Sequence, residues 1–157
     1  MVVERVITCN MNAVESGSDF IAKPTEAQGY LVAAQGMLAG ATPLGNLATV
    51  PVLALTLLCG HSCEAALKAI LCKGGISAVD LSKRPFGHNI LTLWKRADSV
   101  ASLPPQPDWV AQLASVYDRP FHLRYPLDFH FIVLPNNQQL LIGTSTLVQL
   151  AERCVNA

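Results

Sequence analysis

The hydrophobic and polar positions of this chain predict one long central helix with shorter helices around it. Residues 50–75 read VPVLALTLLCGHSCEAALKAILCKGG and are apolar for most of their length. Residues 53–59 are apolar on every face, as a helix is when other elements cover it on all sides. Lys73, Gly74 and Gly75 then supply the cation and the left-handed residues that end a helix. The pattern therefore predicts a central helix whose first half is fully covered.

A polar stripe begins in the second half of this central helix. His61, Glu64 and Lys68 follow one another at spacings of three and four residues, so at ~100° per residue they fall within roughly 60° of one face. Glu64 and Lys68 also have the spacing of an ordinary ion pair on a helix surface. The stripe fits two interpretations, a solvated helix face or one wall of a binding site.

Four further helices follow from apolar residues at helical spacing and from the signals at their ends. They are a helix from a Thr25/Gln28 capping box to about residue 39, closed by Gly40 and Pro43; a helix that opens at Gly87-His88-Asn89; a helix that starts at Pro107-Asp108; and a final helix capped by Thr144 or Ser145. Trp94 and Trp109 lie on the inner faces of two of these helices and are expected in the core. Residues 76–86 are expected to form a loop.

The stretch before the last helix has a different pattern. Within an irregular segment, residues 119–143, two short apolar runs at residues 129–134 and 138–142 flank a Pro-Asn-Asn turn, an order that favours a small β-hairpin. Residues 1–23 loosen into Asn, Ser and Gly and predict an N-terminal arm or tail. The whole chain, residues 1–157, predicts a single all-α domain: a bundle of about five helices around the long central helix, with one small hairpin before the last helix.

Composition narrows the choice of partners. Hydrophobic residues make up 51% of the 157 residues and charged residues 14%, so a core forms readily and much apolar surface is left over. Burial of that surface favours a homodimer or a protein partner. Eleven basic residues balance eleven acidic ones, so no overall field attracts nucleic acid or an acidic membrane, and any anion site is local.

The five cysteines fit a reducing compartment. Their number is odd, their spacing is not paired, and three of them lie on the central helix, where Cys acts as a small buried hydrophobe. Cys59, His61 and Cys63 do not form a metal-binding set, because His61 points away from both thiols and no second ligand cluster follows. We therefore expect a cytoplasmic protein with no metal and no cofactor. No signal peptide is evident, and the apolar part of the central helix is shorter than a bilayer requires, so no membrane span is expected.

A set of residues spread from the central helix to the next helix start forms a recognisable pattern: Glu64, Lys68, Gly74, Gly75, Gly87, His88, Asn89, Ile90 and Leu93. This pattern resembles the HEPN superfamily of helical domains, whose members often carry a Glu-(Ala/Leu)-x-Leu-Lys helix followed across a loop by a Gly-His-Asp-Leu helix start. Here the match covers roughly residues 50–100, and Asn89 stands where Asp is usual. The resemblance implies a small helical bundle, usually a homodimer, that often acts near nucleotide or nucleic-acid chemistry.

The resemblance also implies a candidate active site. Many members of the superfamily are metal-independent ribonucleases that use an Arg followed a few residues later by a His, a spacing that Arg124 and His130 fit. In such an enzyme the His moves a proton at the 2′-hydroxyl or leaving oxygen, and the Arg holds the scissile phosphate. Tyr125 stands where the superfamily usually has a polar residue, and Pro126 breaks the helix on which the motif usually begins.

The sequence thus supports three functional hypotheses. The one we favour is a dimeric HEPN-like binding module for a phosphate-bearing ligand, a nucleotide or RNA, or for a protein partner. Its ligand-binding residues would be His61, Glu64, Lys68, His88, Arg124 and Tyr125. The alternatives are a metal-independent ribonuclease that uses Arg124 and His130, and a purely structural protein-interaction module. In the first hypothesis His88 lies beside the polar stripe of the central helix.

Overall fold

The computed structural model describes residues 23–118, 121–123 and 133–157, and the regular structure within them is entirely helical. Its helices are α1 (Glu26–Gly45), α2 (Val52–Lys73), α3 (Ala78–Ser82), α4 (Ile90–Ala101), α5 (Asp108–Tyr117) and α6 (Asn137–Asn156). The predicted all-α bundle is confirmed, with six helices in the described residues instead of about five. The additional helix is α3, which lies in a segment predicted as a loop and begins where the Ser77 hydroxyl accepts from the Asp80 N–H. The predicted N-terminal arm lies almost wholly outside the described residues.

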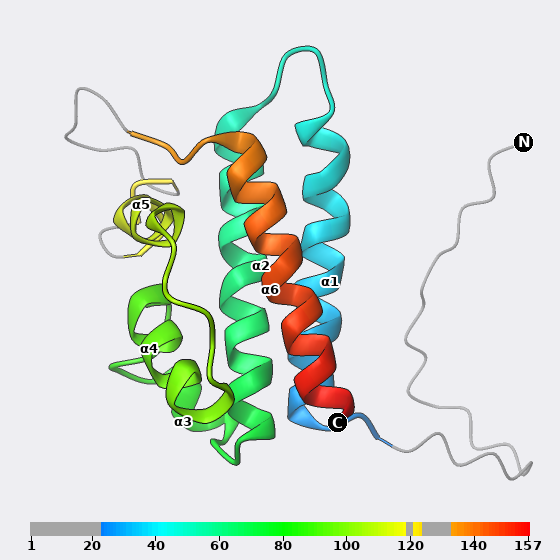
Figure 1. The fold of residues 1–157 in the computed structure, drawn as a ribbon, viewed down its shortest axis with the longest axis vertical. Coiled ribbons are helices and arrows are strands. Elements are labelled where there is room, and N and C mark those ends of the chain that lie inside the picture. The colour runs from blue at the N-terminus through cyan, green and yellow to red at the C-terminus, as the bar shows by residue number, and fades with distance from the viewer. Residues whose placement is uncertain (1–22, 119–120, 124–132) are drawn as a thin grey trace, which may run out of the picture.

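Three long helices, α1, α2 and α6, form the body of the bundle (Figure 1). α1 runs antiparallel to α2 and α6, and the starts of α2 and α6 lie at the end of the bundle that the loop of residues 46–51 closes. α3, α4 and α5 lie along the other side of α2. α2 contacts every other helix and is therefore the central helix that the sequence predicted.

α1 begins at the predicted capping box but ends later than predicted. The Thr25 hydroxyl accepts from the Gln28 N–H at 3.2 Å, and the Gln28 side chain accepts from the Thr25 N–H at 2.8 Å. The predicted end near residue 39, closed by Gly40 and Pro43, is wrong, because α1 continues to Gly45. Pro43 lies in the last turn and removes only one backbone hydrogen bond, while Ala41 in the same turn is fully buried against the bundle. Packing therefore outweighs the local signal.

The burial of α2 is the reverse of what its sequence predicted. Val52 is 38% exposed and Leu53 is 51% exposed, so the first turn is not covered on all sides. The second half is the better covered part, and even Glu64 and Lys68 are buried there. The reason lies in the arrangement: the first turn of α2 stands at the end of the bundle, whereas the second half lies between α1, α6 and α4 (Figure 1).

The predicted hairpin before the last helix is wrong where the structure describes it. Residues 138–142 form the first turns of α6, and the irregular segment predicted around them ends at Asn136. The Asn136 side chain caps the helix by accepting from the N–H groups of Gln138 and Gln139 at 3.0 and 3.1 Å. The Pro-Asn-Asn sequence thus starts a helix instead of turning between strands. The first predicted strand, residues 129–134, lies mostly outside the described residues.

α4 and α5 begin where they were predicted to begin. The Asn89 side chain caps α4 by accepting from the Thr92 N–H at 2.9 Å, and α5 starts at Asp108. Trp94 of α4 is buried and Trp109 of α5 is half-buried. Their rings meet edge to face with 6.4 Å between centroids. Both indoles therefore contribute to the core, Trp109 at its margin.

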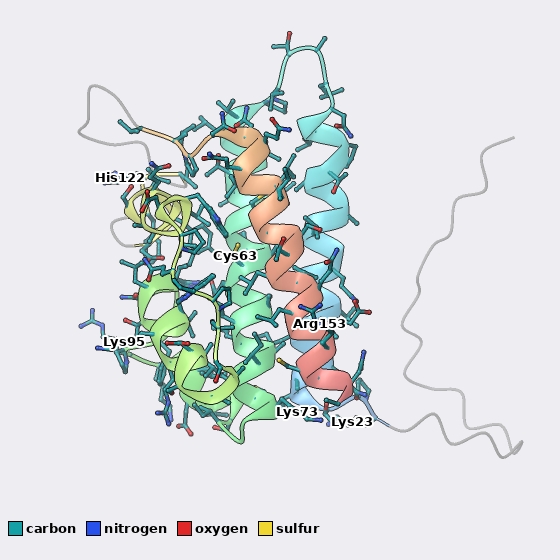
Figure 2. The ribbon with its side chains drawn as sticks, viewed as in Figure 1. Lys23, Cys63, Lys73, Lys95, His122 and Arg153 are labelled. Carbon is teal, nitrogen blue, oxygen red and sulfur yellow. The ribbon has the colours of Figure 1, made fainter. Side chains whose placement is uncertain are left out.

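Charged side chains are absent from one large part of the described surface. Residues 27–63 and 133–151 contain no Asp, Glu, Lys or Arg, and they form most of α1, the first half of α2 and most of α6. We call this region the uncharged surface. It carries seven of the ten exposed large hydrophobic side chains: Val32, Met37, Leu47, Val52, Leu53, Val133 and Ile142. The cations labelled in Figure 2 lie in the half of the bundle away from the loop between α1 and α2: Lys23, Lys73, Lys95 and Arg153.

α2 also has the length and hydropathy of a helix that could cross a membrane. It has 22 residues, and its most apolar window has a mean hydropathy of 1.3. However, 72% of that window is buried inside the bundle. The central helix of a compact bundle has the same properties, so α2 is weak evidence for a membrane span.

Two leucines on α2 test this description of its burial. Leu55→Ala should lower the free energy of unfolding by about 2–5 kcal/mol, because Leu55 is fully buried and its truncation leaves a cavity. Leu53→Ala, the same change two residues earlier, should cost less than about 1 kcal/mol because that side chain is half in solvent. Urea unfolding followed by circular dichroism compares the two variants. A larger loss at Leu53 would mean that the first turn of α2 is covered after all.

Candidate functional site

The side chain of Glu64 lies at the centre of a buried polar cluster. Its Oε1 accepts a hydrogen bond from Lys68 Nζ at 2.6 Å, one turn further along α2. Its Oε2 lies 2.9 Å from His88 Nδ1 and accepts from the Tyr117 hydroxyl at 2.6 Å. The expected position of His88 beside the polar stripe is confirmed. We call these four residues, together with His61, the Glu64 cluster.

His61 joins the Glu64 cluster through Tyr117. His61 Nδ1 lies 2.9 Å from the Tyr117 hydroxyl oxygen, and the two rings pack edge to face with 5.3 Å between centroids. Because the Tyr117 hydroxyl donates its proton to Glu64, it accepts from the Nδ1–H of His61. Gly60 allows this approach, since a Cβ at that position would overlap the Tyr117 ring. The geometry of the cluster therefore depends on a glycine one turn before Glu64.

Lys68 and Glu64 form a buried ion pair, not the surface pair that their spacing suggests. Glu64 is 7% exposed and Lys68 is 6% exposed. Lys68 Nζ also lies 5.9 Å from the centroid of the Tyr30 ring on α1, within the range of a cation–π contact. Elements from both sides of α2 cover the polar stripe, which spacing along one helix cannot reveal. Removing one partner of such a pair leaves an unpaired buried charge, so Lys68 is committed to Glu64.

Two opposing effects act on the pKa of Glu64. Burial raises the pKa, because the charged carboxylate loses its hydration. Hydrogen bonds from Lys68, Tyr117 and His88 oppose that rise, and the resulting pKa lies below the ordinary value of a glutamate. Glu64 is therefore ionised at neutral pH. Its contribution to stability is present above the ordinary pKa and is lost as the pH falls through the lowered one.

The side chain of Asp118, the residue that follows α5, lies at the N-terminus of α4. Both of its carboxyl oxygens accept from the Ile90 N–H, each at 3.1 Å. Burial raises the pKa of Asp118 to about 6, the hydrogen bonds from the Ile90 and Leu91 backbone oppose the rise, and nearby Glu64 adds to it. The protein itself thus satisfies the first amide of α4. That helix start is consequently not an open anion site.

A pocket of about 590 Å³ opens beside His88 and Asp118, and we call it the His88 pocket. Its walls come mainly from the chain between α3 and α4, residues 84–89, and from Phe121. The His88 side chain is 45% exposed, and its ring meets the Phe121 ring edge to face at 5.8 Å between centroids. Arg84 on the wall is exposed and forms no ion pair or hydrogen bond with another residue that the structure describes.

The second half of the predicted site lies outside the described residues. Arg124, Tyr125 and His130 fall within residues 124–132, so ribonuclease action by Arg124 and His130 stays a prediction. The described part of the same segment reaches the His88 pocket, because Phe121 forms part of its wall.

Three residues of this site were not identified from the sequence. Tyr117 is part of the apolar stripe of α5, so its pattern predicts only a core residue. The one signal that could have indicated its role is that a buried tyrosine hydroxyl needs a hydrogen-bond partner. Asp118 is 28 residues from Ile90, and no local pattern links a carboxylate at the end of one helix to the start of another. Arg84 lies in a loop, and from the sequence alone an exposed cation in a loop is interpreted as a charge that contacts only solvent. Of the predicted residues, the structure brings together His61, Glu64, Lys68 and His88.

Cys59 and Cys63 are buried thiols of the core. Cys63 Sγ lies 3.4 Å from Thr144 Oγ1, where α2 meets α6 (Figure 2). Burial raises the pKa of Cys63 to about 12 and that of Cys59 to about 11. Both side chains are therefore protonated at neutral pH and act as small apolar groups.

Comparison with protein-family models, with curated protein sequences and with solved structures finds no match to this chain. The HEPN resemblance is carried by its motif residues alone. Two of those residues, Glu64 and His88, are hydrogen-bonded to each other in the structure.

Asp118→Asn should change how stability depends on pH. A carboxyl whose folded pKa is raised stabilises the fold most below its ordinary value of 3.8, and this contribution is lost as the pH rises through about 6. The free energy of unfolding of Asp118→Asn, measured relative to wild type, should therefore increase as the pH rises across this window. Urea unfolding at several pH values measures it, with Asp98→Asn on the exposed face of α4 as the matched control. A relative stability that decreases over the same window would contradict a raised pKa at Asp118.

Proposed function

We propose that this protein is a dimeric HEPN-like binding module that takes a phosphate-bearing ligand, a nucleotide or an RNA end, in the His88 pocket. The observation that carries the proposal is that Arg84, exposed and without a described partner, shares this pocket with His88. The volume of about 590 Å³ lies within the range of sites for small molecules and cofactors. The pocket therefore combines room for a nucleotide with a cation that could bind its phosphate.

Arg84 and His88 have complementary roles in this proposal. The Arg84 guanidinium is planar and can donate two parallel hydrogen bonds to phosphate oxygens. His88 contributes Nε2, because its Nδ1 faces Glu64. Lys68, the cation that the sequence suggested for the ligand, is buried with Glu64 and acts here by holding the Glu64 carboxylate in place. Arg84 replaces Lys68 as the phosphate contact.

Asp118 sets the pH range in which the pocket accepts an anion. Its carboxyl group lines the pocket, and in its ionised form it repels a phosphate. Since the pKa of Asp118 is about 6, the carboxyl becomes neutral as the pH falls through that value. The pocket is therefore most favourable to an anion on the acidic side of neutral pH.

Adenosine monophosphate should bind the protein more tightly than adenosine, because only the nucleotide offers a phosphate to Arg84. Arg84→Ala should weaken binding of the nucleotide by roughly 10- to 100-fold, the effect of losing a hydrogen bond to a charged group, and leave adenosine binding unchanged. Isothermal titration calorimetry at pH values on both sides of the Asp118 pKa measures these affinities.

Lys83→Ala is the matched control for Arg84→Ala. Lys83 is the neighbouring exposed cation. Its Nζ lies 3.6 Å from Asp80 Oδ1, and Lys83 is not on the wall of the His88 pocket. Equal losses in the two variants would show that net charge, not the pocket, attracts the nucleotide. Equal binding of nucleotide and nucleoside would contradict the phosphate contact.

The uncharged surface supports the homodimer in this proposal. In a two-fold dimer the same patch of both subunits meets, so a charge near the axis would face its own copy and repel it. A surface with seven exposed large hydrophobic side chains and no charged residue in residues 27–63 and 133–151 avoids that repulsion. The same surface also fits a different protein partner, which is the remaining alternative of a pure interaction module.

Leu53→Lys should dissociate the homodimer, because it places a charge on each copy of the uncharged surface. Val79→Lys is the matched control, since Val79 is similarly exposed but lies on α3, outside that surface. Size-exclusion chromatography with light scattering gives the mass of wild type and both variants at micromolar concentration. A monomeric wild type, or a dimer that survives Leu53→Lys, would contradict this part of the proposal.

A further inference from the structure

A second pocket, which shares no residue with the His88 pocket, opens between α4, α5 and α6. We call it the tryptophan pocket. Its volume is about 230 Å³, and no charged residue lines it. Besides two leucines of α6, its walls are formed by Trp94, Pro104, Pro107, Trp109, Gly143 and Thr146. Since an apolar cavity of about 150 Å³ takes up benzene, this pocket has room for a molecule of about two fused rings.

The walls of the tryptophan pocket are fixed without a ligand. Residues 104–107, between α4 and α5, read Pro-Pro-Gln-Pro, and each proline ring restricts the backbone φ angle. Trp94 is only 5% exposed and packs edge to face against Trp109. Gly143 lets Trp109 lie against α6, since a Cβ at that position would overlap the indole ring. A pocket formed in this way needs little ordering when it binds, so little of the binding free energy is lost.

One polar group on these walls is available to a ligand. Trp109 Nε1–H forms no hydrogen bond with any residue that the structure describes, and it is open to solvent, because every fully buried side-chain nitrogen or oxygen there has a partner. Nε1 belongs to the edge of the indole that lies against Gly143. The Thr146 hydroxyl is already engaged, because it donates to the Ile142 carbonyl at 2.9 Å. An indole N–H only donates, so the ligand atom that meets it must be an acceptor.

We propose that the tryptophan pocket binds a small, planar and uncharged molecule: an aromatic system of about two fused rings with a hydrogen-bond acceptor directed at Trp109 Nε1. Aromatic rings gain free energy from contact with indoles beyond the area they bury, which favours a planar ring over an aliphatic one. A charged molecule would lose hydration here without meeting an opposite charge. This ligand is additional to the phosphate-bearing molecule proposed for the His88 pocket.

Quinoline is a suitable probe for the full-length protein, because it has two fused rings, one acceptor nitrogen and no charge at neutral pH. Trp94 and Trp109 are the only two tryptophans of the chain. In the NMR spectrum of ¹⁵N-labelled protein, both indole N–H signals therefore report on the tryptophan pocket. Quinoline should shift both signals in a saturable way. Arg84→Ala should leave its affinity unchanged, since Arg84 does not line this pocket.

Thr146→Phe should weaken quinoline binding roughly 10-fold or more, because it places a phenyl ring in the pocket. Thr146 is exposed, so the substitution leaves the core intact. Gln149→Phe is the matched control, since Gln149 is exposed on the same helix and does not line the pocket. Circular dichroism verifies that both variants keep their helices.

Trp109→Phe tests the acceptor, with the Trp94 signal as the readout. It keeps an aromatic wall and removes the N–H, so it should weaken quinoline binding by roughly 3- to 10-fold more than binding of naphthalene, which has the same shape and no acceptor.

Indole signals that do not move at millimolar quinoline, or quinoline binding that survives Thr146→Phe, overturn the proposal. Equal losses in Thr146→Phe and Gln149→Phe also overturn it, because they indicate adsorption to apolar surface. Equal losses of quinoline and naphthalene in Trp109→Phe contradict the hydrogen bond. None of these outcomes depends on nucleotide binding, so this proposal and the proposed function can fail separately.

Discussion

The buried carboxylate of Glu64 is the constraint on which the rest of this structure depends. An ionised side chain with 7% exposure is tolerated only while its hydrogen-bond partners stay in place. Those partners come from three places: Lys68 on α2 itself, His88 just before α4, and Tyr117 at the end of α5. The hydrogen bonds of His88 and Tyr117 to the Glu64 carboxylate therefore hold α4 and α5 against α2, in addition to the apolar packing of these helices on α2. The same hydrogen bonds that hold the fold orient the imidazole at the pocket.

The two sides of α2 are built differently. Toward α1 and α6, long helices pack through small and apolar residues, and polar groups there are fully satisfied within the body of the bundle, as where the Ser62 hydroxyl donates to the Ala34 carbonyl at 2.8 Å. Toward α4 and α5, helix ends meet, and helix ends bring unsatisfied backbone groups that need polar partners. Asp118 at the start of α4 is one such partner. The buried polar contacts of Glu64 and Asp118 thus lie where the ends of α4 and α5 meet the central helix α2.

Local signals in the sequence marked some helix boundaries and misplaced others, since α1 continues past Pro43 and α6 begins well before the predicted cap at Thr144 or Ser145. The Thr25/Gln28 capping box and the Gly87-His88-Asn89 sequence marked real helix starts, and the spacing of Glu64 and Lys68 indicated a real pair. Burial of that pair was not predictable, because it depends on Tyr30 and on elements that pack from other parts of the chain. The Pro-Asn-Asn sequence before α6 is compatible with a turn and with a helix cap, and only tertiary packing decides between them. The hydrogen bond from Tyr117 to Glu64 was not predictable for the same reason, since the Tyr117 ring fits an apolar stripe and only the fold brings its hydroxyl to Glu64.

Gly60 has a consequence for how this site would be found by genetics. It has no functional group, yet the Tyr117 ring lies where its side chain would be. Any substitution there must displace Tyr117, and with it the hydroxyl that bridges His61 and Glu64. In a saturation mutagenesis map, substitutions of Gly60 should therefore be as harmful as substitutions of the Glu64 cluster itself. Positions intolerant to mutation should therefore include Gly60, which contacts no ligand and matters only because the absence of a side chain leaves room for the Tyr117 ring.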